Sequence, residues 1–108
     1  MRANELRHLV TLQRRSVTRT SIGSEVISWA KVSDFYTKAE ALSGNESFKY
    51  KQLFAETVVR FTLRYRKDIA AEMRIVWEGL HYDIFDISDP EGRKIELVVL
   101  AKQGLTQG

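Results

Sequence analysis

The chain has 108 residues, of which 44% are hydrophobic, 17 are basic and 14 are acidic, with one proline and no cysteine. This length fits a single domain over 1–108, and the lack of cysteine excludes disulfides, thiol nucleophiles and thiolate metal sites. The apolar run Leu97–Ala101 is far shorter than the roughly 20 residues of a membrane-spanning helix, and no apolar signal-peptide core is present, so we expect neither a membrane nor an export protein. The formal charge of +3 allows an anionic partner without establishing nucleic-acid binding.

The chain begins with a strand pattern that leads into a turn. Val10 and Leu12 alternate with polar residues, which places both on one face of a strand over 8–14. The following residues, 18–24, are predicted to form the turn, with Gly23 in the positive-φ position that glycine takes without steric cost. The period of two therefore predicts the start of an antiparallel sheet.

A second extended run, over 25–41, is followed by a helix signal. Ser43 and Glu46 have the spacing of a capping box, in which two side chains satisfy two free backbone amides reciprocally. We therefore expect one short helix that ends before Thr57 and covers an opening or face of the sheet. The inward row of the preceding strand consists of Phe35, Thr37, Ala39 and Ala41.

The second half of the chain contains the clearest strand, over 57–65. From Val59 to Tyr65 its apolar residues fall on one face and alternate with the basic face of Arg60, Thr62 and Arg64. Two further strand-like runs, 73–77 and 80–84, flank Glu78-Gly79, which predicts a tight hairpin with the glycine at positive φ.

The last turn and strand complete the expected fold. Asp89, Pro90 and Gly92 occupy the positions that these residue types favour in a type I turn, and a final strand is expected over 94–102. Five or six such strands with hairpin spacing predict a mainly β fold, a small rolled antiparallel sheet or β-barrel with the short helix inserted in the middle. Rolling is favoured because it hides the exposed edges of the sheet.

The residue types that perform chemistry form no convincing catalytic or metal-binding group. His8 and His81 lie in predicted strands, without metal-site spacing to a carboxylate pair. Asp83, Asp86 and Asp89 recur every three residues, but without the glycine-centred loop of a calcium motif, so solvation and turn capping explain them better. No glycine-rich phosphate loop is present. We therefore expect neither an enzyme nor a cofactor.

A row of basic residues is the strongest candidate for binding. Arg60, Arg64 and Arg66 follow one another on the polar face of the 57–65 strand and its end, where guanidinium groups could meet phosphates. The alternative is a solvated strand face whose charges pair with neighbouring carboxylates. Lys49 and Lys51 on the predicted helix have the same two interpretations, DNA contact or solvent exposure.

Several short strings follow one another between residues 6 and 100: Leu6–Gln13, Trp29, Ala41–Glu46, Arg64–Arg66, Met73–Trp77 with Gly79 and Tyr82, and Asp89-Pro90. In order and spacing the chain resembles the phage head–tail joining proteins, the head-closure or stopper family of long-tailed bacteriophages. Three residues depart from the family pattern: Lys67 and Ala70 stand where proline is frequent, and Leu80 stands where a basic or polar residue is frequent.

The resemblance implies a structural role without any reaction or small-molecule substrate. Such a subunit forms a ring with copies of itself beneath the portal and its adaptor, closes the DNA-filled head and offers a docking surface for tail proteins. Its location would be the head–tail interface of the virion, after assembly in the host cytoplasm.

The resemblance also assigns roles to particular segments. The stretch 43–56 would project toward the channel and bring Lys49 and Lys51 into non-specific contact with packaged double-stranded DNA, without base readout. The ends, about 1–5 and 103–108, would be flexible until they order against neighbouring subunits. Contacts with other subunits or partners would use Phe48, Tyr50 and Phe54.

Two other functions remain open at this point. A tail-terminator or tail-side joining ring has the same requirements, because small rolled sheets with a loop toward a lumen occur on both sides of the phage neck. A small nucleic-acid-binding β-barrel is the alternative from another class, and it would use Arg60, Arg64 and Arg66.

Overall fold

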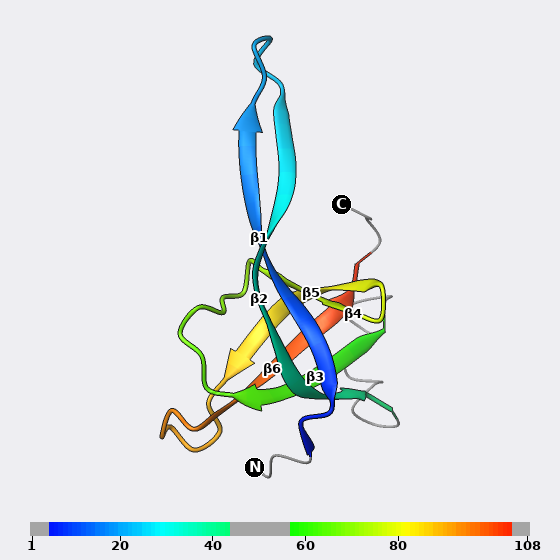
Figure 1. The fold of residues 1–108 in the computed structure, drawn as a ribbon, viewed down its shortest axis with the longest axis vertical. Helices are drawn as coiled ribbons and strands as arrows, with labels where there is room; N and C mark the ends of the chain where they lie inside the picture. Colours follow the sequence, from blue (N-terminus) through cyan, green and yellow to red (C-terminus); the bar gives the residue numbers. More distant parts are fainter. Residues whose placement is uncertain (1–4, 44–56, 105–108) are drawn as a thin grey trace.

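The structure is a computed structural model that describes residues 5–43 and 57–104. It shows an antiparallel barrel with the strand order β1-β2-β3-β6-β5-β4, closed by pairing of β4 with β1 (Figure 1). The predicted mainly β fold is confirmed. The predicted helix lies almost wholly in residues 44–56, outside the described residues. The six strands are β1 (His8–Arg19), β2 (Glu25–Ala41), β3 (Val58–Arg64), β4 (Arg74–Trp77), β5 (Leu80–Ser88) and β6 (Glu96–Gln103).

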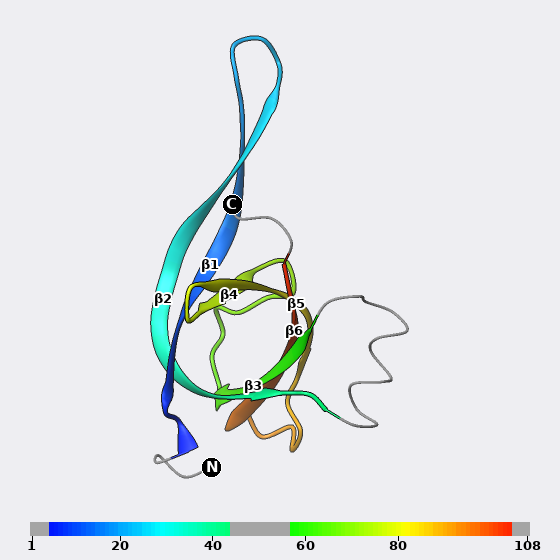
Figure 2. The ribbon, with the colours of Figure 1, turned by 90° about the vertical axis from the view of Figure 1, so that its right-hand side faces the viewer.

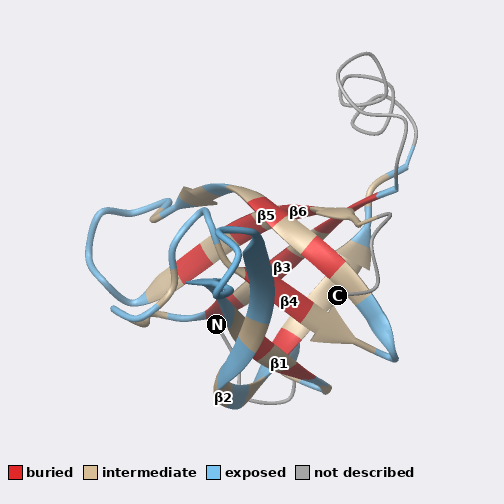
Figure 3. Ribbon diagram, turned by 90° about the horizontal axis from the view of Figure 1, so that it is seen from above, coloured by how far each residue is buried: buried red, intermediate tan, exposed pale blue. Residues whose placement is uncertain are grey.

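The core fills the interior of the barrel with the inward side chains that the period of two predicts. Buried bands alternate with partly exposed ones along the strands in Figure 3. At the centre, the fully buried Phe61 ring meets Trp77 and Tyr82 edge-on, with ring centroids 6.0 and 5.7 Å away. The other members of this core are Val10, Leu12, Val59, Leu63, Ile75, Ile84, Leu97, Val99 and Ala101.

The inward row of β2 is confirmed along most of its length. Phe35 and Ala39 pack against the core, and Thr37 is fully buried. The Thr37 hydroxyl donates a hydrogen bond of 2.8 Å to the backbone carbonyl of Thr62 on β3. This bond satisfies the one polar group that the row places inside the barrel. Ala41, at the end of the row, is exposed.

The first two strands continue beyond the barrel as a long hairpin. β4 pairs with β1 only over Thr11–Gln13, and farther along β1 pairs with β2 alone. The β1–β2 register shifts at this point, because Leu12 faces Ser33 whereas Gln13 faces Lys31. Such a bulge increases the local twist and bends the strands. Figures 1 and 2 show the hairpin projecting along the long axis of a molecule that measures 50 × 30 × 26 Å.

The hairpin makes the first strand longer than the sequence predicts. β1 runs to Arg19 rather than ending near residue 14, and the turn is confined to the residues between Thr20 and Ser24. The backbone amide of Gly23, at a φ of 87°, donates to the Thr20 carbonyl at 3.0 Å, as expected for a glycine turn. The segment Ser16–Arg19 contains a single apolar residue, Val17, so its pairing with β2 left no alternation in the hydrophobic pattern.

The two other predicted turns are confirmed. Glu78 and Gly79 have φ values of 52° and 80°, the pair of positive values that a type I′ hairpin requires. Asp89 caps its turn by accepting hydrogen bonds from the backbone amides of Gly92 at 3.1 Å and Lys94 at 2.9 Å. Turn capping therefore explains Asp89, as the sequence indicated.

The last strand is displaced from its expected position. Lys94 has a φ of 58°, which interrupts the extended backbone, so β6 begins at Glu96 instead of residue 94. At its other end, the backbone amide of Gln103 donates to the Thr57 carbonyl and that of Gly104 donates to the His81 carbonyl, both at 2.8 Å. Residues 103 and 104 therefore belong to the sheet and its margin, which corrects the flexible end expected from residue 103.

Candidate interaction site beside the end of β3

The three arginines of the predicted basic face do not form one row of free cations. Arg60 lies on β3 directly opposite Glu40 of β2, and its Nε is 3.6 Å from a Glu40 carboxylate oxygen. Arg64 is the exposed last residue of β3. Arg66 lies beyond the strand end. Among the described residues, Arg64 alone of the three has no ion-pair partner within 4.0 Å.

Arg66 is held in place by one carboxylate and one aromatic ring. Its Nε and a terminal nitrogen donate hydrogen bonds of 2.9 and 2.8 Å to the two carboxylate oxygens of Asp68. Its guanidinium carbon lies 4.4 Å from the centroid of the Phe35 ring, in cation–π geometry. The hydrogen bonds from Arg66 lower the pKa of Asp68 below its ordinary value, and partial burial opposes this shift. Arg66 therefore has much of its charge compensated within the chain.

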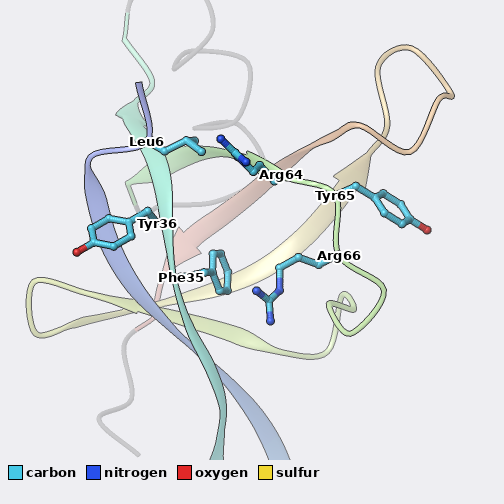
Figure 4. A pocket seen from close by; sticks show the side chains of 6 residues that line it. All are labelled: Leu6, Phe35, Tyr36, Arg64, Tyr65 and Arg66. Atoms are coloured by element: carbon cyan, nitrogen blue, oxygen red, sulfur yellow. The ribbon is translucent and has the colours of Figure 1, made fainter. Parts of the chain in front are cut away.

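Arg64 and Arg66 line a hollow of about 380 Å³ together with apolar side chains (Figure 4). In Figure 4 the Arg66 side chain extends toward the Phe35 ring, whereas Tyr65 points outward from the segment after β3. The other lining residues are Leu6 before β1 and Tyr36 on β2, whose side chain is exposed. Within this cationic and aromatic hollow, Arg64 is the guanidinium group that a carboxylate could pair with.

The sequence places two of the lining residues on opposite faces of β2. Phe35 and Tyr36 are consecutive on β2, so one points toward the core and the other toward solvent. An exposed tyrosine opposite an equally exposed Leu9 on β1 marks an apolar surface spot. The proximity of Leu6 depends on how the chain enters β1, which the strand periodicity does not determine.

The remaining candidate residues lie partly outside the structure. Lys49, Lys51 and the aromatic contact residues Phe48, Tyr50 and Phe54 all fall within residues 44–56, outside the described residues, and their roles stay predictions.

His8 makes two contacts within the barrel. His8 accepts a hydrogen bond of 3.1 Å at Nδ1 from the Ala39 amide, and its ring meets Trp77 edge-on at 5.4 Å. In residues 5–43 and 57–104, no three histidine or carboxylate side chains gather in a geometry that could hold a metal ion. That same part of the chain contains no helix long and apolar enough to cross a membrane.

A comparison with known protein families identifies the family of this chain. The family model described as phage head completion protein matches residues 1–104, nearly the whole sequence. The chain belongs to the phage head completion protein family. Head completion proteins are structural proteins of the phage virion, so this chain has a structural role in the head, as the resemblance implied. No curated protein matches the chain significantly in sequence.

Two solved structures share the fold of this head completion protein. The solution structure of protein SF1141 from Shigella flexneri 2a superposes with a TM-score of 0.77 at 25% identity, covering 99% of this chain and 100% of SF1141. A chain from the virion of a native gene transfer agent particle has a TM-score of 0.63 at 14% identity, covering 94% of this chain and 97% of its own length. At 14% identity the second likeness shows the common fold alone.

Proposed function

We propose that this head completion protein forms a ring of identical subunits at the neck of the virion, beneath the portal and its adaptor. The ring closes the DNA-filled head and offers a docking surface for tail proteins. The observation that carries this proposal is the family match over residues 1–104. The similar chain from a gene transfer agent virion supports it, because a fold of this type occurs there within an assembled particle.

The barrel has the physical properties expected of a small subunit that gains stability when it assembles. Its core consists of a single cluster, and both its aromatic hollow and its projecting hairpin expose apolar side chains. A partner that binds only the folded state stabilises that state by mass action. A modest core is therefore enough to keep the subunit folded once neighbouring subunits are in contact with it. The subunit is proposed to fold in the host cytoplasm and to join the head afterwards.

Lys49 and Lys51 are proposed to face the DNA channel, with Phe48, Tyr50 and Phe54 in contacts between subunits or with partners. Lysines that contact phosphates without reading bases hold DNA non-specifically and let it slide, as a channel requires. The variant Lys49→Gln/Lys51→Gln tests this role. It should assemble normally but release or eject DNA with altered salt dependence, and an unchanged salt dependence would refute the channel role.

Electron microscopy of the protein mixed with its portal and adaptor tests the ring directly. The expected image shows an additional ring of density on the tail-facing side of the portal–adaptor complex. A complex whose dimensions stay unchanged at saturating protein would contradict the proposal. Separate purification of heads and tails distinguishes the two sides of the neck, because a tail-side joining ring would be found on isolated tails and absent from isolated heads.

A further inference from the structure

The part of the β1–β2 hairpin that extends beyond the barrel, residues 14–31, forms an arm with two free edges. Within the described residues, β4 pairs with β1 only as far as Gln13, and β3 pairs with β2 only from Lys38. The arm is thus a two-stranded ribbon, which is marginally stable in water by itself. Free edges of this kind are ready to pair with another chain.

The arm carries the whole formal net charge of the protein. Four of the 17 basic residues and one of the 14 acidic residues lie in residues 14–31, which gives +3. The rest of the chain has 13 residues of each sign and no net charge. Arg19 pairs with Glu25 at 3.3 Å, and Lys31 pairs with Asp34 at 2.6 Å.

Two cations of the arm are available to a partner. Within residues 5–43 and 57–104, no carboxylate lies within ion-pair distance of Arg14 or Arg15, and both side chains are exposed. These arginines line a hollow of about 330 Å³ together with Val17, with Met73, which precedes β4, and with Glu72, whose carboxylate lies beyond ion-pair distance of both guanidinium groups. With two arginines and one glutamate, the base of the arm offers a net positive charge next to the apolar side chains of Val17 and Met73.

The arm also carries half of the large hydrophobic side chains that the described residues expose. Val17 lies directly opposite Ile27 in the β1–β2 register, so the two share one face of the ribbon, and Ile22 at the turn is 85% exposed. The four such residues of the arm are Val17, Ile22, Val26 and Ile27, and the four elsewhere are Leu9, Tyr36, Leu80 and Ile95. Apolar side chains gathered on one projecting element mark a binding surface.

The combination of charge and apolar surface discriminates between three candidate binding partners of the arm. Nucleic-acid phosphates match the arginines but leave the four apolar side chains in water. A second copy of this chain offers a barrel without net charge and an arm that repels another arm. A different protein with an acidic rim around an apolar groove satisfies both properties.

We propose that the β1–β2 arm docks into an apolar groove with an acidic rim on a neighbouring virion protein other than this chain. The assignment of that partner to the virion rests on the proposed function. The Val17–Ile27 face enters the groove, Ile22 anchors the tip, and Arg14 and Arg15 pair with carboxylates at its rim.

Purified heads from a phage that lacks this protein provide the assay, whether or not they still hold DNA. Co-sedimentation with these heads is measured for the wild type and for two arm variants, Arg14→Ser/Arg15→Ser and Val17→Thr/Ile27→Thr. Threonine keeps the preference for strands while removing apolar surface. The controls outside the arm are Arg7→Ser/Arg93→Ser and Leu80→Thr/Ile95→Thr, which change exposed residues of the same types. Circular dichroism and thermal unfolding of every variant confirm that the barrel stays folded.

Each arm variant is expected to bind heads about tenfold more weakly or worse, as for central interface residues, whereas the controls stay within about twofold of the wild type. The arginine variant should also lose part of the salt dependence of binding. Arm variants that bind like the wild type overturn the arm proposal and leave the proposed function intact. Failure of the wild type to bind heads contradicts the proposed function itself.

Two further measurements test the other two candidate partners, DNA and a second copy of this chain. The free wild-type protein is titrated with short double-stranded DNA, and its sedimentation is measured over a range of protein concentrations. DNA affinity that disappears in the arginine variant, or self-association that disappears in the Val17→Thr/Ile27→Thr variant, would overturn the assignment to a different protein. The proposal expects neither.

Discussion

The guanidinium carbon of Arg74 lies 4.1 Å from the centroid of the Trp29 ring, so a tryptophan at the base of the projecting hairpin covers a cation on β4. Arg74 is only 3% exposed, and its Nε donates a hydrogen bond of 2.6 Å to the side-chain oxygen of Gln13. Burial lowers the pKa of Arg74, and the nearby Asp83 carboxylate opposes this shift. Three strands therefore meet at one buried cation where the hairpin leaves the barrel.

Trp29→Ala should destabilise the protein, because it removes the cation–π contact and admits water to a guanidinium that the fold buries. A desolvated contact of this kind contributes about 1 to 2 kcal/mol, which corresponds to a fall in Tm of several degrees for a domain of this size. Urea unfolding measures the change. Trp29→Phe, which keeps an aromatic face, should retain most of the stability, and equal losses in the two variants would contradict the cation–π explanation.

Phe61→Ala tests whether the barrel interior depends on its central ring. Phe61 is fully buried and contacts Trp77 and Tyr82 edge-on. Truncation of a buried phenylalanine costs about 3 to 5 kcal/mol, a large part of the 5 to 15 kcal/mol that typically stabilises a domain. The thermal unfolding midpoint should fall steeply, whereas Tyr65→Ala, at a half-exposed position beyond β3, should change it less. Similar midpoints for the two variants would contradict the assigned core.

Glu78→Asn should stabilise the β4–β5 hairpin. Glu78 has a φ of 52°, a region that asparagine enters more easily than glutamate, and asparagine followed by glycine is the preferred pair in a type I′ turn. We expect a gain of about 0.5 to 1 kcal/mol in the free energy of unfolding. Glu78→Ala is the matched control, because it removes the same charge without relieving the backbone. A gain of equal size in both variants would assign the effect to charge instead.

The stability of the Arg66–Asp68 pair should depend on pH in the acid range. The pKa of Asp68 is lowered in the folded protein, so the ionised carboxylate favours folding. This contribution is present above the unfolded pKa of about 3.9 and is lost as the pH falls through the lowered folded value. The unfolding free energies of the wild type and Asp68→Asn should therefore converge in acid. A difference that stays constant between neutral pH and pH 2 would contradict this sign.

The sequence predicts the barrel well where a strand has one buried face. Val59, Phe61 and Leu63 alternate with polar residues, and the structure buries all three. The outer half of the hairpin lacks this signal, because neither face of a projecting ribbon is covered by the core. The hydrophobic pattern along the chain also does not show which distant strands pair with each other. The burial of Arg74 depends on Gln13 and Trp29, which come from β1 and β2.

The candidate sites are predicted less completely than the fold. The pairing of Arg60 with Glu40 follows from the register of β3 against β2, which a single sequence leaves undetermined. The contact of Arg66 with Phe35 has the same origin. The charge of the arm, by contrast, is visible in the sequence, since residues 14–31 contain four basic residues and one acidic residue. The surplus of basic residues lies within one short segment, and the total of +3 alone does not locate it.

The role of this protein in closing the head is tested most directly by nuclease protection of packaged DNA. Heads are assembled by a phage whose gene for this chain carries an early stop codon, purified, and incubated with DNase with and without the purified protein. The proposed function predicts that DNase digests the DNA of heads incubated without the protein, and that added wild-type protein protects this DNA from digestion. Heads that retain their DNA without this protein, or that lose it equally after saturating addition, would contradict the account.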